Sequence, residues 1–350
     1  MKVMMALSGG VDSSVAAGIL KNAGHTVCGA TLHLAGTPQH DAQMAADALG
    51  IPFYEFFEQE AFEKKVIAAF EESYKSGETP NPCIICNRLI KFGLLLDLAR
   101  KLGQDCLATG HYAKLKHDAA TGRTLLMRAK DPAKDQTYML YLLTQDQLTH
   151  AMFPLGDLTK KEIREMAKDM QLPSANKPDS QDICFVPDGD YAAFLEKRSG
   201  TAYPKGNFVN EAGEVLGQHQ GIIRYTIGQR KGLGIALGQP AFVLSKNAKT
   251  NQVILGTEEK LFSRRVFADR LNWIACEKPS GGMEVTAKTR YSHKESKATL
   301  HLLDNDLVLA EFAEPQRAPA PGQAMVFYDG DVVVGGGTII SGDKNNEAID

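Results

Sequence analysis

The stretch Ala6-Leu7-Ser8-Gly9-Gly10-Val11-Asp12-Ser13-Ser14 decides the fold, because it joins an apolar run to a helical pattern through two glycines. Residues 3–7 predict a short buried strand, and residues 13–23 predict a helix that Gly24 ends. Glycines at such a junction let the backbone approach a phosphate, and the N–H groups at the helix start favour an anion. The serines add hydroxyl donors, and Asp12 could hold a magnesium ion.

A glycine-rich turn that merely caps a helix is the structural alternative for this stretch, since such turns occur in any α/β fold. The Gly-x-Gly-x-x-Gly pattern and the Gly-x4-Gly-Lys-Ser/Thr pattern are both absent, which disfavours a dinucleotide-binding fold and a P-loop NTPase. Strand and helix patterns go on alternating, with glycine after three of the helices, and predict a parallel sheet covered on both faces. The expected segments are 26–32, 41–49, 53–57, 60–74, 89–102 and 105–109.

Three domains and a tail are expected along the chain: 1–199, 200–265, 266–342 and 343–350. The first is Rossmann-like α/β; it also contains a hairpin of 113–116 with 123–128, a capping box at 159–162 and a short helix at 191–198. Beyond Gly200 short β-rich segments take over, which predicts a small central domain and a C-terminal β-barrel-like domain. These segments are 241–245, 252–255, 283–289, 298–303, 307–312, 324–328 and 332–334.

The charge balance is nearly neutral, with 39 Lys+Arg against 42 Asp+Glu and a net charge of −3 over 350 residues. This argues against a protein that coats nucleic acid through global charge, but leaves room for a local basic surface. The apolar run at the start is too short for a signal-peptide core, and no later run is long enough to cross a membrane. We therefore expect a cytoplasmic protein with no membrane partner.

The 6 cysteines are too few for a disulfide scaffold and divide into two groups. In the stretch Thr79-Pro80-Asn81-Pro82-Cys83-Ile84-Ile85-Cys86-Asn87, two prolines stiffen a loop that delivers Cys83 and Cys86 to a helix start. A thiol there is expected to have a lowered pKa, which makes Cys86 a candidate nucleophile. Cys184 lies among polar residues and is a candidate partner thiol. Small core residues are expected at the other three positions, Cys28, Cys106 and Cys276.

The stretch Ser8-Gly9-Gly10-Val11-Asp12-Ser13 resembles the signature of the ATP-pyrophosphatase (PP-loop) enzymes, which split ATP into AMP and pyrophosphate and adenylate a substrate oxygen. Alone it leaves open synthetases, amidating ligases and tRNA-modifying enzymes. Further motifs in the same order resemble the tRNA-specific 2-thiouridylases (the MnmA family) over about residues 1–340. They are 79–87, 108–112, 134–136, 179–185, 226–234, 290–291 and 321–323.

The resemblance implies roles for individual residues and a reaction. ATP would adenylate O2 of the wobble uridine at position 34 of tRNA, and a persulfide sulfur would then attack C2 as AMP leaves. Cys184 would carry that persulfide, and Cys86, the second catalytic cysteine, would form a transient disulfide with it. ATP would be contacted by Ala6, Leu7, Ser8, Gly9, Gly10, Val11, Asp12, Ser13, Leu32 and Gly110. The target base would lie near Asn81, Pro82 and Cys83, and other parts of the tRNA near His111, Lys134, Asp135, Gln136, Arg290, Tyr291 and Gln323.

Two departures from the family pattern bear on cofactors. Many relatives carry Asp where this chain has Cys83, and three thiolates at Cys83, Cys86 and Cys184 are enough to hold a [4Fe–4S] cluster with one iron open. Persulfide chemistry without a metal and a zinc site that borrows His111 are the alternatives, and the sequence leaves them open. The segment 33–40 is also shorter than in many relatives.

Two other functions remain as alternatives at this point. One is a PP-loop adenylating ligase or amidating synthetase acting on a small molecule, which would need no sulfur relay. The other is a protein that binds tRNA without catalysis. If the chain is a thiouridylase, its sulfur donor would be a cysteine desulfurase, a sulfur carrier or free sulfide, and the sequence does not say which.

Overall fold

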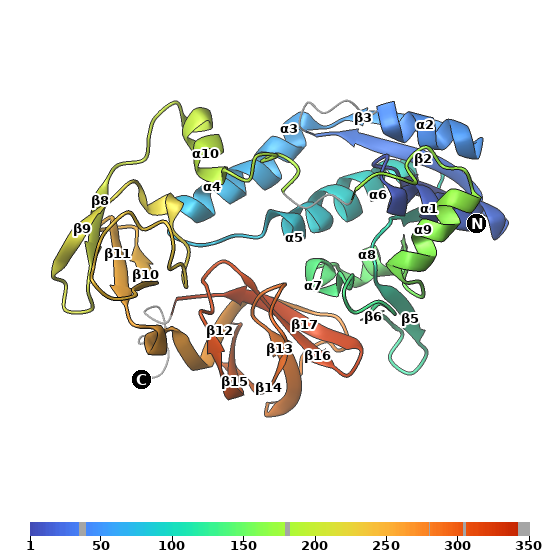
Figure 1. The fold of residues 1–350 in the computed structure, drawn as a ribbon. Coiled ribbons are helices and arrows are strands. Elements are labelled where there is room, and N and C mark those ends of the chain that lie inside the picture. Colours follow the sequence, from blue (N-terminus) through green and yellow to red (C-terminus); the bar gives the residue numbers. More distant parts are fainter. Residues whose placement is uncertain (35–39, 179–182, 280, 304–305, 342–350) are drawn as a thin grey trace.

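A parallel sheet, a small central sheet and a closed barrel follow one another along the chain (Figure 1). The computed structural model describes residues 1–34, 40–178, 183–279, 281–303 and 306–341. The first sheet has the order β3-β2-β1-β4-β7, with every pair parallel. Its strands are β1 (Lys2–Ala6), β2 (Thr26–His33), β3 (Phe53–Phe57), β4 (Cys106–Ala108) and β7 (Ala151–Met152).

The central strand β1 explains why this sheet is covered on both faces. Val3 and Met5 point into one apolar core with Val15 of α1 (Val11–Asn22), whereas Met4 points into another core with Phe92. Side chains alternate across a strand, so a continuous apolar run buries both faces. The predicted α/β class is confirmed. The helices α2 (His40–Leu49), α7 (Thr137–Leu140), α8 (Gln145–Thr149) and α9 (Lys160–Asp169) complete this part of the chain.

Two long helical runs carry π-helical segments that the sequence pattern does not predict. One run consists of α3 (Gln59–Phe62), η1 (Glu63–Ile67) and α4 (Ala68–Lys75). The other consists of α5 (Pro82–Cys86), η2 (Asn87–Leu95) and α6 (Leu96–Lys101). The predicted helices 60–74 and 89–102 are therefore present, and the second begins earlier than expected. A π-helical turn changes which side chains share a face, and such turns occur often at functional sites.

The central sheet has the order β10-β11-β8-β9. Its strands are β8 (Gly206–Val209), β9 (Val215–His219), β10 (Phe242–Asn247) and β11 (Gln252–Gly256), with short 3-10 turns at η3 (Ile222–Arg224) and η4 (Glu258–Leu261). Only β10 and β11 match predicted segments, because β8 has only 4 residues and β9 buries just one of its side chains, His219. Helix α10 (Tyr191–Ser199) packs Leu195 against the same core as Phe208.

The C-terminal strands form an antiparallel barrel that closes by pairing β12 with β17. The strands are β12 (Phe262–Trp273), β13 (Met283–Lys288), β14 (Ser296–Leu303), β15 (Leu307–Arg317), β16 (Ala324–Asp329) and β17 (Val332–Ile339). The predicted hairpin is confirmed as β5 (Lys114–Asp118) with β6 (Arg123–Met127), but it joins this barrel sheet through the pair Val332–Met127. Sequence patterning missed β12, whose inward positions are interrupted by polar and charged residues.

The expected domain boundary at residue 265 lies inside β12, and the expected tail 343–350 lies outside the described residues. Most of the segment 33–40 and part of the motif 179–185 also lie outside them. In the part of the chain that is described, no helix is long and apolar enough to cross a membrane.

Candidate active site

The phosphate loop is held by its own serines and by a close backbone approach. Gly9 has a φ of +74°, and a Cβ there would lie 2.4 Å from Cβ of Asp41, so only glycine fits. Ser13 and Ser14 donate hydrogen bonds to the Gly10 carbonyl at 3.2 and 2.8 Å. Helix α1 begins directly after Gly10 with no side chain capping it. Its first N–H groups are thus available to an anion, as the sequence predicts.

Asp12, the expected magnesium ligand, is engaged by two groups from distant parts of the chain. The Tyr112 hydroxyl and the Lys160 ammonium both donate to Asp12 Oδ1 at 2.7 Å. Its other oxygen, Oδ2, takes no hydrogen bond from another described residue, so the carboxylate keeps one oxygen for a cation. Magnesium binding by Asp12 remains a prediction.

Lys160 is a residue that sequence reasoning missed. It is the first residue of α9, and Thr159 caps that helix in a capping box with Glu162, as predicted. The box fixes the helix start, and α9 packs beside α1, so the ammonium is held in front of the phosphate loop. The side chain is only 13% exposed. A cation in this position is suited to binding the phosphates of ATP.

The loop after β4 connects the phosphate loop to the cysteine-bearing helix. Gly110 packs against the phosphate loop so closely that a Cβ there would lie 2.8 Å from the Ser13 nitrogen. Phe92, which lies on the cysteine-bearing helical run, has its ring 6.1 Å from that of His111. Three consecutive residues, Gly110, His111 and Tyr112, therefore contact both halves of the site.

His111 is a buried, neutral histidine. Its Nδ1 lies 2.7 Å from the Thr109 hydroxyl, and the ring of Phe153 lies at 6.0 Å. Burial, with a smaller contribution from the charge of Lys91, holds the pKa of His111 well below its usual value. A neutral imidazole can accept or donate one hydrogen bond at the strand end, but little of its surface reaches solvent.

The helix α5 begins at Pro82, before the start of the helix predicted at 89–102. Asn81 accepts a hydrogen bond from the Cys83 N–H at 3.2 Å, and Pro82 occupies the first helical position, where its missing N–H costs nothing. The run is fixed from the other side by Asn87, whose amide donates to the Met139 carbonyl at 3.0 Å. Cys83 is exposed and Cys86 is buried.

The expected lowered pKa of Cys86 is wrong. Cys86 is the last residue of α5, the helical run continues beyond it, and its thiol is buried with Phe62 and Phe70. Burial disfavours the thiolate and raises the pKa of Cys86 to about 11. Burial also raises the pKa of Cys83 and of Cys184. A negative charge on Cys184 would raise the pKa of Cys86 further, so the two thiols are close enough to interact. Phe185, which follows Cys184, packs in the same core as Cys86.

The thiols do not form an assembled metal site. All six cysteines are free, and among the described residues no three His, Cys, Asp or Glu side chains are arranged to hold a metal ion. The three thiols differ in exposure, because Cys86 is buried whereas Cys83 and Cys184 are exposed. Cys28 and Cys106 are buried core residues as predicted, whereas Cys276 is half-buried at the edge of the barrel core.

The residues expected to contact tRNA lie at junctions between the parallel-sheet region and the two β regions. Arg290 donates to the carbonyls of Ile227 and Ala318 at 2.8 and 2.9 Å. Gln323 donates to the Thr79 carbonyl at 2.7 Å, directly before the cysteine loop. In this structure both side chains make contacts within the chain.

Lys134, Asp135 and Gln136 precede α7. Asp135 is buried and accepts from the Thr137 hydroxyl at 2.6 Å, while Gln136 accepts from the Tyr112 N–H at 3.0 Å. Tyr291 donates to the Asp135 carbonyl at 3.2 Å, yet its ring is 39% exposed and open to stacking. Leu32, expected near ATP, is half-buried against the cores beside β2.

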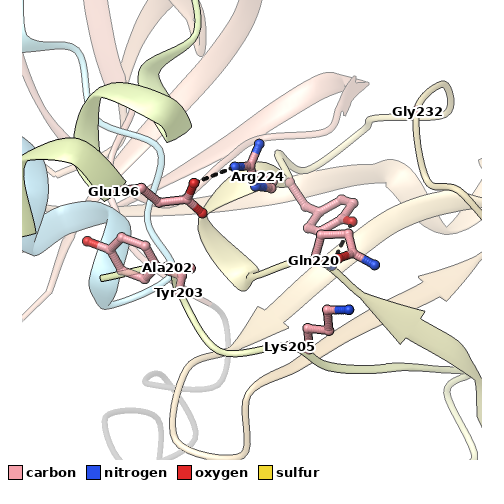
Figure 2. A pocket seen from close by; sticks show the side chains of 8 residues that line it. Glu196, Ala202, Tyr203, Lys205, Gln220, Arg224 and Gly232 are labelled. Atoms are coloured by element: carbon pink, nitrogen blue, oxygen red, sulfur yellow. Dashed lines mark hydrogen bonds and ion pairs between the residues drawn. The ribbon is translucent and has the colours of Figure 1, made fainter. Parts of the chain in front are cut away.

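A cavity of about 610 Å³ lies elsewhere, between α10 and the central sheet. Figure 2 shows the ion pair between Arg224 and Glu196, 2.7 Å apart, at its edge. Its lining includes Tyr203 and Lys205 but no residue of the phosphate loop or the cysteine helix. This cavity is thus separate from the candidate chemistry.

Comparison with known proteins decides the family. The family model described as the tRNA methyl transferase HUP domain matches residues 1–188, and the PRC-barrel and Aminomethyltransferase beta-barrel models match 192–257 and 263–339. The tRNA-specific 2-thiouridylase MnmA of Lachnoclostridium phytofermentans is 48% identical over 97% of this chain and 99% of its own. The chain belongs to the MnmA family. The MnmA proteins of Desulfitobacterium hafniense and Moorella thermoacetica are 48% and 49% identical, each over 97% of this chain and 98% and 99% of their own lengths.

Membership of the MnmA family confirms the resemblance that the sequence motifs indicated. It also agrees with the order of folds along the chain, because the three matched segments cover the parallel sheet, the central sheet and the closed barrel. Which residues act, and on which atoms, still has to be argued from the site itself.

Proposed function

We propose that this protein catalyses the ATP-dependent 2-thiolation of uridine in tRNA. The observation that carries the proposal is that the phosphate loop and the cysteine-bearing helical run both contact one loop, 109–112, in a chain of the MnmA family. ATP activates an oxygen of the uridine by adenylation, and the thiols supply sulfur. A small-molecule ligase would use the phosphate loop alone and leave the cysteines without a role.

The proposed target is uridine 34, with ATP adenylating O2. The N–H groups at the start of α1 and the Lys160 ammonium would hold the phosphates, and Asp12 would hold magnesium. Magnesium would neutralise phosphate charge during adenylation. The residues Asn81, Pro82 and Cys83 are proposed to face the base, because they lie at the start of the cysteine helix, where the Cys83 side chain is exposed.

Sulfur transfer then follows in two steps. The terminal sulfur of a Cys184 persulfide attacks C2 of the uridine, and the adenylated oxygen leaves as part of AMP. The Cys86 thiolate next attacks the Cys184 sulfur, the sulfur–sulfur bond breaks towards the base, and 2-thiouridine leaves with a Cys86–Cys184 disulfide behind it. A dithiol reductant restores the two thiols. The persulfide would be loaded by a cysteine desulfurase or by a sulfur carrier that already holds persulfide sulfur. Free sulfide would load it only by attacking the Cys86–Cys184 disulfide, which releases the Cys86 thiolate and leaves the persulfide on Cys184.

The arrangement of the three thiols favours this relay over a bound cluster. Cys86 is buried and Cys83 exposed, and the described residues provide no assembled set of ligands. Measuring iron and acid-labile sulfide in protein purified without oxygen tests this point. We expect less than one iron per chain, whereas about four irons with three cysteines required for their binding would favour the cluster.

A comparison of two activities tests the proposed function. With tRNA, ATP, magnesium and a cysteine desulfurase with cysteine as sulfur source, the Cys184→Ser variant should still release pyrophosphate in a tRNA-dependent way but, unlike wild type, form no 2-thiouridine. Pyrophosphate release that does not depend on tRNA, or thiolation that survives both Cys86→Ser and Cys184→Ser, would contradict the proposal. The exposed Lys101→Met variant is a suitable control, since that side chain lies away from the site.

A further inference from the structure

Lys91 is a cation that the family motifs and the functional argument so far do not use. It lies in η2 and is half-buried. Within the described residues it makes no hydrogen bond and no ion pair, although most half-buried cations in this structure have a carboxylate or carbonyl partner. An enclosed ammonium without a fixed partner is suited to a negatively charged group that arrives during the reaction.

The π-helical segment places Lys91 on the same face as the thiols. In an α-helix, residues five apart point about 140° away from each other. In η2 the backbone bonds instead run over five residues, as in the bond from the Leu96 N–H to the Lys91 carbonyl. Residues five apart in such a segment are neighbours on one face, as residues four apart are in an α-helix, and Lys91 follows Cys86, the residue directly before η2, by five. Cys83 and Cys86 already share a face at α-helical spacing.

The electrostatics of the site agree with this geometry. The charge of Lys91 acts on all three thiols and on His111. Burial raises the pKa of each thiol, and Lys91 is the one described cation that opposes that rise. The dominant effect is burial, so the site would otherwise strongly disfavour negative sulfur.

We propose that Lys91 stabilises the anionic sulfur of this site, first the persulfide on Cys184 and then the attacking thiolate of Cys86. This inference rests on the proposed function and adds to it a residue for the sulfur-transfer steps. The ammonium forms and breaks no covalent bond. It lowers the energy of both negatively charged sulfur species, most strongly at Cys86, whose thiol is buried, and less at the exposed Cys184.

The experiment compares the variants Lys91→Met, Lys91→Arg and Lys101→Met. Lys101 is an exposed lysine on the same helical run and serves as the matched control. The first readout is the rate at which iodoacetamide alkylates Cys86 and Cys184 in reduced protein at one neutral pH, resolved by peptide mass spectrometry. The second readout is 2-thiouridine formed in a single turnover, with tRNA-dependent pyrophosphate release measured beside it.

Lys91→Met should slow alkylation of both cysteines and sulfur transfer by about tenfold, the effect of one nearby charge at intermediate dielectric. Pyrophosphate release should stay unchanged, and Lys91→Arg should restore most of both lost rates. Unchanged alkylation in Lys91→Met overturns the proposal, and so does a loss that arginine fails to restore. If no variant and no wild-type protein forms 2-thiouridine, the proposed function fails, while the alkylation rates still decide the role of Lys91.

Discussion

Replacing Gly110 with alanine should separate the two halves of the active site. An alanine Cβ would lie 2.8 Å from the Ser13 nitrogen and 3.0 Å from the Asp12 carbonyl carbon. Favourable contacts of this kind begin near ~3.5 Å, so the loop after β4 has to move by about 0.7 Å. The opposing atoms are backbone and cannot rotate away. The phosphate loop would therefore be displaced from the cysteine helix.

A displacement of this size at reacting groups costs on the order of 10- to 100-fold in rate. We expect kcat/KM for tRNA-dependent pyrophosphate release to fall by that factor in Gly110→Ala, with a loss of unfolding free energy of about 1–3 kcal/mol from overpacking. Urea denaturation of the same preparations measures the second quantity. Gly281→Ala is the control, because no atom lies within 4 Å of its Cβ position. An unchanged kcat/KM in Gly110→Ala would refute the reasoning.

Three further changes test other contacts. Lys160→Met should raise the KM for ATP by about 10- to 100-fold, because a charge-assisted hydrogen bond to phosphate is lost, and should leave the KM for tRNA unchanged. An unaltered KM for ATP would show that Lys160 does not bind the phosphates. Thr159→Ala should lower the free energy of unfolding by about 1 kcal/mol through loss of the α9 cap, and a chevron or urea midpoint unchanged from wild type would contradict this. Burial depresses the folded-state pKa of His111, so its contribution to stability is complete above its ordinary pKa near 6.5 and declines as the pH falls below that value. In His111→Gln the urea midpoint should therefore fall less steeply below pH ~6.5 than in wild type. If the two proteins lost stability equally with falling pH, protonation of His111 would not be the cause of the loss.

The phosphate loop and the parallel sheet could be predicted because their signals are local. A buried strand, a glycine turn and a helix start lie within the stretch 3–23, and each follows from residue types that are adjacent in sequence. The capping box at Thr159 is local in the same way and is confirmed. Short-range physics therefore accounts for where the phosphate site and the cysteine loop lie.

The parts that sequence reasoning missed depend on distant residues. Lys160 is found only through its ion pair with Asp12, 148 positions earlier in the chain. The prediction for Cys86 failed because its environment is set by Phe62 and Phe70, which come from another helical run and bury the thiol. The expected position of Cys86 at a helix start predicted a lowered pKa. Burial raises the pKa of this thiol instead and is the larger effect.

The central claim is that this site transfers sulfur to uridine at the expense of ATP, and analysis of tRNA nucleosides tests it most directly. Unmodified tRNA would be incubated with anaerobically purified protein, ATP, magnesium, a dithiol, and a cysteine desulfurase with cysteine as the source of persulfide sulfur, then digested and analysed by mass spectrometry. The account predicts 2-thiouridine that requires ATP and both Cys86 and Cys184. Folded protein that hydrolyses ATP but forms no 2-thiouridine under these conditions would contradict it.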